Sequence, residues 1–223
     1  MDEDTRPAAR AGRPGRQAQR SAEMRQRLCQ ATLDVLCEVG YERLSTPMIA
    51  KRAGVSRGAQ THHFSSKADL LVGAFQHLLG NWEQARIAAF GTTDPPRVPL
   101  ETYLRFAWRE IFGQPSYVAA LELMMAARAD TRLGERLREA LDNWALRRGA
   151  VWREVLRFSG LREDDAFQHI NLCLLRGMAV HRGFNHDESD SEAVLEQWIA
   201  MVRHLAVVPV AVAGPELMHN EAP

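Results

Sequence analysis

Residues 46–71, TPMIAKRAGVSRGAQTHHFSSKADLL, constrain the fold more than any other part of the chain. Two short helical patterns are joined there at Gly54, and the small side chains of Ala50 and Ala53 allow the two helices to approach closely. Short helices joined by a glycine-containing turn form a helix-turn-helix, whose second helix lies in the major groove of DNA. The segment therefore predicts a DNA-binding unit.

Signals on either side of the motif predict where the neighbouring helices begin and end. Apolar residues with helical spacing between positions 28 and 39 predict a helix that begins near Glu23 and ends at Gly40. Thr46 and Pro47 are typical of a helix start, with threonine as the cap and proline as the first helical residue. The motif is thus expected to rest on a longer first helix.

Serine caps predict two further helix starts. Ser56 precedes a third helix that extends to about His62, and Ser66 with Asp69 matches the capping box of a fourth helix that continues toward Phe90. Beyond a break rich in Gly, Thr and Pro, helical patterns cover residues 98–112, 116–128, 130–158, 164–182 and 190–206. No segment shows the alternation of a strand, so the fold class is predicted to be all-α.

The charge distribution agrees with a DNA-binding N-terminus. The formal net charge is zero, but residues 1–68 hold 12 Lys and Arg against 7 Asp and Glu, whereas residues 69–223 hold 16 against 21. A net charge of zero is compatible with DNA binding, because only the basic N-terminal part needs to contact the phosphates. No apolar stretch is long enough for a membrane helix and no secretory signal is present, so we expect a cytoplasmic protein. Cys29, Cys37 and Cys173 are expected to be buried, reduced residues.

The motif resembles the TetR family of regulators. Gly40-Tyr41, the run from Ile49 to Ser56 (IAKRAGVS) and the run from His63 to Leu70 (HFSSKADL) carry this resemblance. It implies that Thr46 and Lys67 anchor phosphates, and that further DNA contacts come from Ser56, Arg57, Gly58, Thr61 and His62. Phe64 is expected to be a core residue.

The recognition helix departs from the usual family pattern at two positions. Gln60 replaces the usual leucine, and Thr61 replaces the usual tyrosine. The side chain of Gln60 is able to contact base edges, so we count it among the DNA-binding candidates. The adjacent His62 and His63 make a poor metal site because neighbouring helical residues point in different directions, and no metal or cofactor is expected.

An arginine-rich arm, residues 1–22, precedes the motif and is expected to be disordered. Arg13 and Arg16 flank a proline and a glycine in a pattern loosely similar to an AT-hook, which inserts arginine into the minor groove. General attraction to phosphates and the absence of any role remain alternatives.

The resemblance implies the organisation of the remaining chain. Residues 23–68 form the helix-turn-helix domain, residues 69–207 a helical domain for effector binding and dimerisation, and residues 208–223 a flexible tail. Residues 69–90 form the connecting helix within the second domain. The dimer contacts are expected on two helical stripes, with ordinary intramolecular packing as the alternative: Ile170, Leu174, Gly177, Met178 and His181, and Val194, Trp198, Met201 and Leu205.

Large, adaptable side chains in the middle helices are candidates to line an effector cavity, since such cavities are mostly apolar. The alternative for each of them is ordinary helical packing. A hydrophobic or aromatic effector is expected, and Glu122, Arg109 or Arg128 are candidates to orient its polar group. The expected effector-binding residues are Phe106, Trp108, Phe112, Leu121, Met124, Met125, Arg128, Trp144 and Trp152.

The predicted function is therefore a homodimeric repressor that an effector releases from a palindromic operator in double-stranded DNA. An enzyme is disfavoured because the sequence has none of the common catalytic motifs, such as a phosphate-binding glycine loop or Gly-x-Ser-x-Gly. An architectural DNA-binding protein and a transcriptional activator remain the alternatives.

Overall fold

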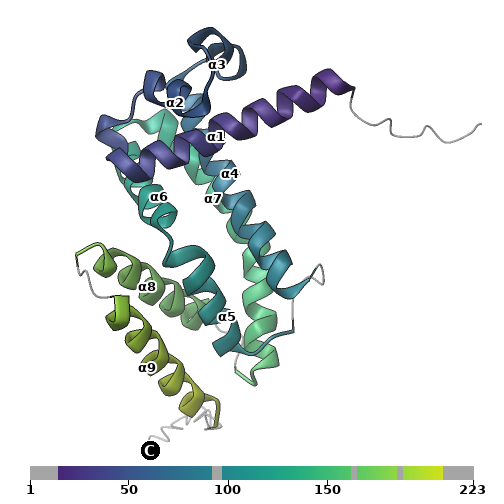
Figure 1. Cartoon of the computed structure of the whole chain (residues 1–223). Helices are drawn as coiled ribbons and strands as arrows, with labels where there is room; N and C mark the ends of the chain where they lie inside the picture. The colour runs from purple at the N-terminus through teal and green to yellow at the C-terminus, as the bar shows by residue number, and fades with distance from the viewer. Residues whose placement is uncertain (1–14, 92–96, 162–164, 185–187, 208–223) are drawn as a thin grey trace, which may run out of the picture. The chain divides into compact units, whose positions relative to one another are not determined.

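The computed structural model describes residues 15–91, 97–161, 165–184 and 188–207, with the side chains of residues 147, 188, 189 and 205–207 left aside. Helices connected by short loops make up these ranges, and no strand occurs within them (Figure 1). The all-α prediction is confirmed. The elements are α1 (Arg16–Arg43), α2 (Thr46–Ala53), α3 (Arg57–His63), α4 (Lys67–Phe90), α5 (Leu100–Ala107), η1 (Trp108–Phe112), α6 (Pro115–Ala126), η2 (Ala127–Ala129), α7 (Thr131–Phe158), α8 (Asp165–Arg182) and α9 (Glu188–Val207).

Helix α1 begins earlier than the sequence predicts. Residues 16–22 are helical and exposed, so the expectation of a disordered arm up to residue 22 is wrong for this stretch. These residues lack an apolar stripe, and the helix propagates into them from the buried part of α1. The helix is interrupted at Gly40, which has φ 75° and ψ 170°, a conformation that favours glycine.

The helix-turn-helix is formed by α2 and α3. Thr46 is the first helical residue and Ser45 occupies the N-cap position, so the predicted role of Thr46 as the cap is wrong by one residue. Gly54 closes α2 in the left-handed conformation with φ 62°, as its place in the turn requires. The Ser56 hydroxyl accepts a hydrogen bond from Ala59 N–H at 3.2 Å, which confirms the predicted cap of α3.

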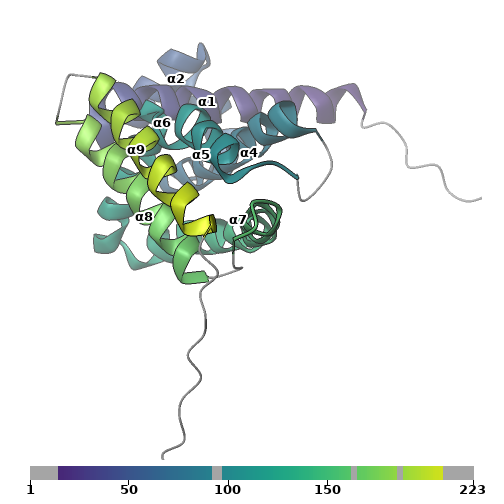
Figure 2. The same cartoon turned by 90° about the horizontal axis from the view of Figure 1, so that it is seen from below.

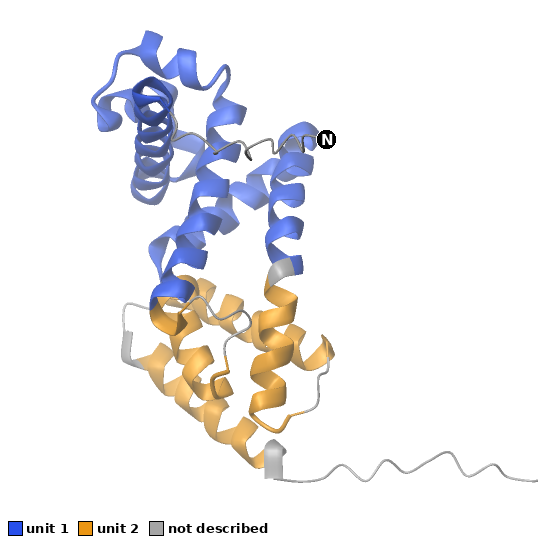
Figure 3. Ribbon diagram, turned by 90° about the vertical axis from the view of Figure 1, so that its right-hand side faces the viewer, with its two compact units in different colours: residues 1–88, 114–147 blue, residues 89–113, 148–223 orange. Residues whose placement is uncertain are grey.

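Contacts divide the chain into two compact units (Figure 3). Unit 1 comprises residues 1–88 and 114–147, and unit 2 comprises residues 89–113 and 148–223. Unit 1 thus holds the helix-turn-helix together with most of α4, all of α6 and the first part of α7. This division does not follow the predicted boundary at residue 68, because helices that lie beyond that residue contribute to the core of unit 1.

Unit 2 contains α5, α8 and α9. Helix α5 runs directly into a π-helical turn, η1, in which Gly113 N–H bonds to the Trp108 carbonyl at 2.8 Å. Helices α8 and α9 lie side by side in both views (Figures 1 and 2). The Trp198 indole N–H donates to Asn171 Oδ1 at 2.9 Å and thereby joins them.

The cysteines differ from one another in their surroundings. Cys29 is buried against the core of unit 1, and burial raises the pKa of its thiol to about 11. Cys37 and Cys173 are exposed, so the prediction that all three cysteines are buried is wrong for these two. Cys37 lies on α1 and Cys173 on α8.

Candidate DNA-binding interface

The outer face of α3 presents the predicted recognition residues to solvent. Ser56, Arg57, Gly58, Thr61 and His62 are all exposed. The Thr61 hydroxyl donates to the Arg57 carbonyl at 2.8 Å, within the helix. The short helix therefore offers one guanidinium, one imidazole and two small residues that allow close approach to a groove.

Gln60 does not belong to this face. Its side chain is only 5% exposed, and its Oε1 atom is buried without a hydrogen-bond partner among the described residues. The expectation that Gln60 contacts DNA is therefore corrected: it occupies the core side of α3, where the helical period places it. A buried unsatisfied amide oxygen costs about 1–3 kcal/mol.

The two predicted phosphate anchors lie at the starts of α2 and α4. Thr46 is partly exposed. The Lys67 ammonium donates to the Leu44 carbonyl at 2.8 Å and lies 5.0 Å from the centroid of the Tyr41 ring. Lys67 is therefore held against the turn that connects α1 to α2.

Two arginines on α1, which the sequence analysis did not single out, hold the ends of the motif's helices. Arg25 Nη1 donates to the His63 carbonyl at the end of α3 at 2.6 Å, and its guanidinium lies 4.3 Å from the centroid of the Phe64 ring. Arg27 Nη2 donates to the Gly54 carbonyl at the end of α2 at 3.3 Å. Cations suit these positions because the carboxyl ends of helices carry partial negative charge. Two arginines two positions apart form no recognisable motif, so the sequence alone does not indicate this role.

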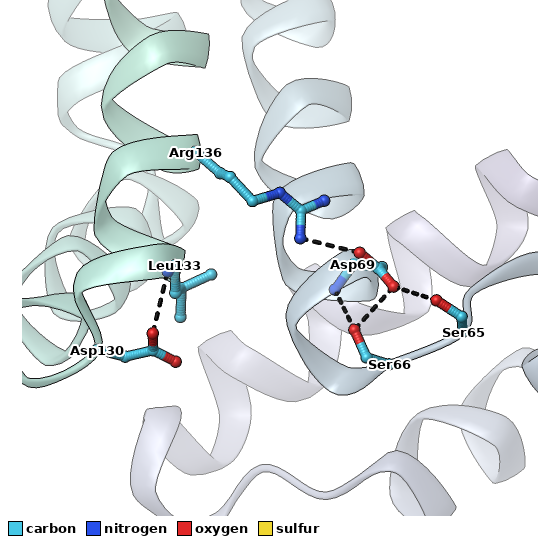
Figure 4. A network of polar contacts seen from close by, with 6 residues as sticks. All are labelled: Ser65, Ser66, Asp69, Asp130, Leu133 and Arg136. Carbon is cyan, nitrogen blue, oxygen red and sulfur yellow. Dashed lines mark hydrogen bonds and ion pairs between the residues drawn. The ribbon is translucent and has the colours of Figure 1, made fainter.

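A polar network joins the start of α4 to α7 (Figure 4). Ser66 Oγ accepts from Asp69 N–H at 3.0 Å, which confirms the predicted serine cap, and it donates to Asp69 Oδ2 at 2.7 Å through its hydroxyl. Ser65 donates to the same carboxylate, and Arg136 Nη1 donates to Asp69 Oδ1 at 2.8 Å. These donors hold the pKa of Asp69 well below its usual range. The network therefore fixes the end of the motif to the rest of unit 1.

A polar groove of about 510 Å³ lies beside this network, between the end of α3, α4 and α7. His63 lines it from α3 and Arg25 from α1, and Arg136 and Glu139 line it from α7. Burial, with smaller contributions from His62 and Arg25, lowers the pKa of His63. Both histidines line the groove, but His63 is partly buried whereas His62 is exposed.

The arginines predicted for the arm fall in different places. Arg16 is the first residue of α1 and is exposed, so it does not belong to an extended, AT-hook-like segment. Insertion of such a segment into the minor groove needs an extended backbone, whereas the backbone at Arg16 is helical. Arg13 lies outside the described residues.

The expected effector-binding residues divide between the two units. In unit 2, Phe106, Trp108, Phe112 and Trp152 are buried. Rings from α4, α5 and α7 cluster around Tyr103, which lies 5.0 Å from Trp152 and 6.0 Å from Phe106 between centroids. Arg148, only 5% exposed, donates to the Tyr103 hydroxyl.

The expected effector residues of unit 1 are less uniform. Leu121, Met124 and Trp144 are partly buried, and Trp144 lies 5.6 Å from Trp82 between centroids. Met125 is 61% exposed and Arg128 is also exposed. The expectation that these two line an interior cavity is corrected, because the α6 period and the η2 turn direct them outward.

A cavity of about 250 Å³ lies within unit 2, where α5, the end of α7 and α9 meet. None of the expected effector residues lines it. Glu101 and Arg203 form an ion pair at its rim, with Arg203 Nη2 3.2 Å from Glu101 Oε1. Its lining residues are Pro99, Leu100, Glu101, Leu104, Phe158, Ser159, Leu161, Ile199, Val202 and Arg203.

The predicted dimer stripes are largely exposed on α8 and α9. Ile170 is 50% exposed, Val194 is 46% exposed and Met201 is 52% exposed. Gly177 and His181 are exposed, and Leu174 is partly exposed.

Two residues of the predicted dimer stripes, Met178 and Trp198, are less exposed than the others. Met178 is buried within unit 2, so its assignment to the stripe is corrected. Trp198 is partly buried, and its indole ring stacks on Phe167 at 6.4 Å between centroids. The side chain of Leu205 lies outside the described part of the chain.

An all-α chain whose first unit exposes a capped recognition helix is a helix-turn-helix DNA-binding regulator. The family model described as bacterial regulatory proteins, tetR family, matches residues 28–74. The HTH-type transcriptional regulator CymR of Pseudomonas putida is 31% identical over 189 residues, which are 84% of this chain and 93% of that protein. The chain belongs to the TetR family of transcriptional regulators.

Solved structures agree with this assignment. A transcriptional regulator from Rhodococcus sp. Rha1 is 25% identical with a TM-score of 0.65, over 83% of this chain and 99% of that one. The multidrug binding protein EbrR, in complex with imidazole, is 25% identical with a TM-score of 0.56, over 84% of this chain and 92% of that one. Regulators of this family bind DNA and small-molecule effectors and act as dimers.

None of the helices in the described ranges is both long and apolar enough to cross a membrane. Within the same residues, no three His, Cys, Asp or Glu side chains are grouped so that they could hold a metal ion.

Proposed function

We propose that this protein is a ligand-responsive, sequence-specific regulator that represses transcription from a palindromic operator and is released by a small hydrophobic or aromatic effector. The observation that carries the proposal is the exposed face of α3, bordered by Lys67, in a unit where Arg25 and Arg27 hold both helices of the motif. Such rigid support is what a recognition helix needs to read base edges.

Within this proposal, Arg57 and His62 read base edges, and Ser56, Gly58 and Thr61 allow the backbone of α3 to approach the DNA. Thr46 and Lys67 bind phosphates near the turn that connects α1 to α2. Gln60 has no part in this reading because it is buried.

The exposed apolar residues of α8 and α9 support dimerisation through these helices. Ile170, Val194 and Met201 would leave apolar surface in water in a single chain, and contact with a second copy would remove it. A β-carbon built at Gly177 would meet no atom within 4 Å, so the backbone of α8 is open to close approach by a partner helix. A symmetric dimer then matches a palindromic operator, with recognition helices about 34–36 Å apart.

The aromatic side chains of unit 2 support an apolar effector. Trp108 and Phe112 belong to the π-helical turn η1, and such turns are frequent at functional sites. The solved EbrR structure with proflavin, which shares the fold, shows an aromatic ligand in that protein. To release the operator, the effector must bind the state that is incompetent for DNA more tightly than the competent state.

Selection of binding sites from random-sequence DNA tests the proposal, followed by titration of the best site and of its two half-sites. A palindromic site that one dimer occupies is expected. Binding without sequence preference would favour an architectural protein. Transcription in vitro from a promoter that carries the selected site then separates repression from activation.

A further inference from the structure

We infer that Glu122, on α6, is a positioning residue for operator binding, which it serves by holding the turn against which the ammonium of the phosphate anchor Lys67 rests. The inference rests on the proposed DNA-binding function. It concerns a link within unit 1, between a helix outside the helix-turn-helix and the chain segment that leads into it.

The first step is the break in α1 at Gly40. Its backbone, with φ 75° and ψ 170°, leaves the helical path just before Tyr41. Glu122 Oε1 accepts this N–H at 2.7 Å. A β-carbon built at residue 40 would lie 2.8 Å from the same oxygen, so a larger residue there would push the carboxylate away from Tyr41 N–H.

The second step connects the turn to Lys67. The Tyr41 carbonyl accepts from Leu44 N–H at 3.3 Å, which closes the turn from residue 41 to residue 44. The Leu44 carbonyl accepts from the Lys67 ammonium at 2.8 Å, and this ammonium also lies 5.0 Å from the Tyr41 ring centroid. Both groups that hold Lys67 therefore belong to the turn that Glu122 fixes.

The third step is the consequence for DNA. Lys67 is a long and flexible side chain that loses rotamer freedom when it binds a phosphate. A turn already fixed by Glu122 presents the ammonium at one place before DNA arrives, which reduces that loss on binding. Without Glu122, the Tyr41 N–H turns to water and the two supports of Lys67 become less ordered.

A double-mutant cycle on the full-length protein tests the inference, with the operator selected by the wild type as the probe. Glu122→Ala is expected to weaken operator binding roughly tenfold, the effect of losing one hydrogen bond to a charged group. In a Lys67→Ala background the same change is expected to have almost no effect, because the two residues act through one contact. Glu122→Gln retains an acceptor oxygen and is expected to restore most of the affinity.

Hydrogen exchange of the Tyr41 amide supplies the direct readout, since it is expected to be slowed in the wild type and fast in Glu122→Ala. Glu135→Ala, which removes an exposed carboxylate of α7, is the matched control for charge. Additive effects of Glu122→Ala and Lys67→Ala, or an unprotected Tyr41 amide in the wild type, would overturn the inference. If the wild type itself selects no operator, the proposed function fails instead.

Discussion

The guanidinium of Arg25 donates to the carbonyl of His63, the last residue of the recognition helix, at 2.6 Å. An exposed arginine near a DNA-binding motif is ordinarily expected to bind phosphate. Here the same side chain covers the Phe64 ring and closes the end of α3. We therefore expect Arg25 to affect DNA binding through the position of the helix.

This relationship predicts a specific result for Arg25→Ala. Operator affinity is expected to fall about tenfold, as for loss of a hydrogen bond to a charged group. The slope of log affinity against log salt concentration is expected to remain that of the wild type, because no phosphate contact is removed. Fluorescence anisotropy over a series of salt concentrations measures both quantities. A slope smaller by about 1 would instead make Arg25 a phosphate contact.

Lys67→Ala is predicted to give the opposite pattern. The variant is expected to bind every DNA sequence more weakly by a similar factor, and its salt slope is expected to fall by about 1. The same titrations check this, with selected and scrambled DNA in parallel. A changed base preference at an unchanged slope would contradict the assignment of Lys67 as a phosphate anchor.

Gln60→Leu is predicted to stabilise the protein. The substitution removes the buried amide whose Oε1 has no partner in the described structure, at similar side-chain volume, and the free energy of unfolding is expected to rise by about 1 kcal/mol. Urea unfolding measures the change. Gln60→Ala is the comparison, because it removes the amide but leaves a cavity and should destabilise the protein. Loss of base discrimination in Gln60→Leu would show that the side chain does reach DNA.

The exposed stripe on α8 and α9 predicts the effect of new charges on assembly. Ile170→Glu and Met201→Glu are each expected to raise the dimer dissociation constant roughly 100-fold, because an unpaired carboxylate would be buried against the partner. Sedimentation equilibrium measures the constant. Val118→Glu, at an apolar position of α6 that is 39% exposed, is the matched control and is expected to leave assembly unchanged.

The Asp69 network predicts how stability depends on pH. The pKa of Asp69 is lowered in the folded state, so its stabilising contribution is present above the ordinary value of about 3.9 and is lost as the pH falls through the folded value. Asp69→Asn is therefore expected to destabilise the protein at pH 7, and the difference from the wild type should shrink below about pH 3.9.

Urea unfolding at a series of pH values measures this dependence. Asp142→Asn, on the exposed side of α7, is the control. Ser66→Ala is expected to cost about 1 kcal/mol through loss of the cap of α4. A destabilisation by Asp69→Asn that persists unchanged at acid pH would mean that the network does not depend on the charge of Asp69.

Local signals were sufficient to predict most of the fold. Cap residues such as Ser56 and Ser66, and breaks such as Gly54, act within one turn of the chain, so the ends of α2, α3 and α4 follow from sequence. Thr46 shows the limit, since adjacent Ser45 is an equally good cap and the two differ only in backbone conformation.

The candidate site was less predictable because its details depend on contacts between distant residues. Arg25 and His63 are separated by 38 positions, and Tyr41 and Glu122 by 81. Neither separation corresponds to a helical repeat or a motif that could be recognised in the sequence. Gln60 is misassigned for a different reason. Its polar side chain suggests a DNA contact, but its position in the helical period places it in the core. The helical period therefore predicts the direction of a side chain better than the residue type does.

Residues 16–22 continue α1 as helix, and this has a consequence for how much DNA one protomer can occupy. A disordered arm can contact DNA at many distances from the recognition helix. Seven residues of helix instead extend a fixed length of roughly 10 Å, which corresponds to about three base-pair steps. Arg16 therefore keeps a constant offset from the recognition helix. The proposed DNA-binding function therefore predicts a fixed distance between the operator core and any base pairs that Arg16 contacts.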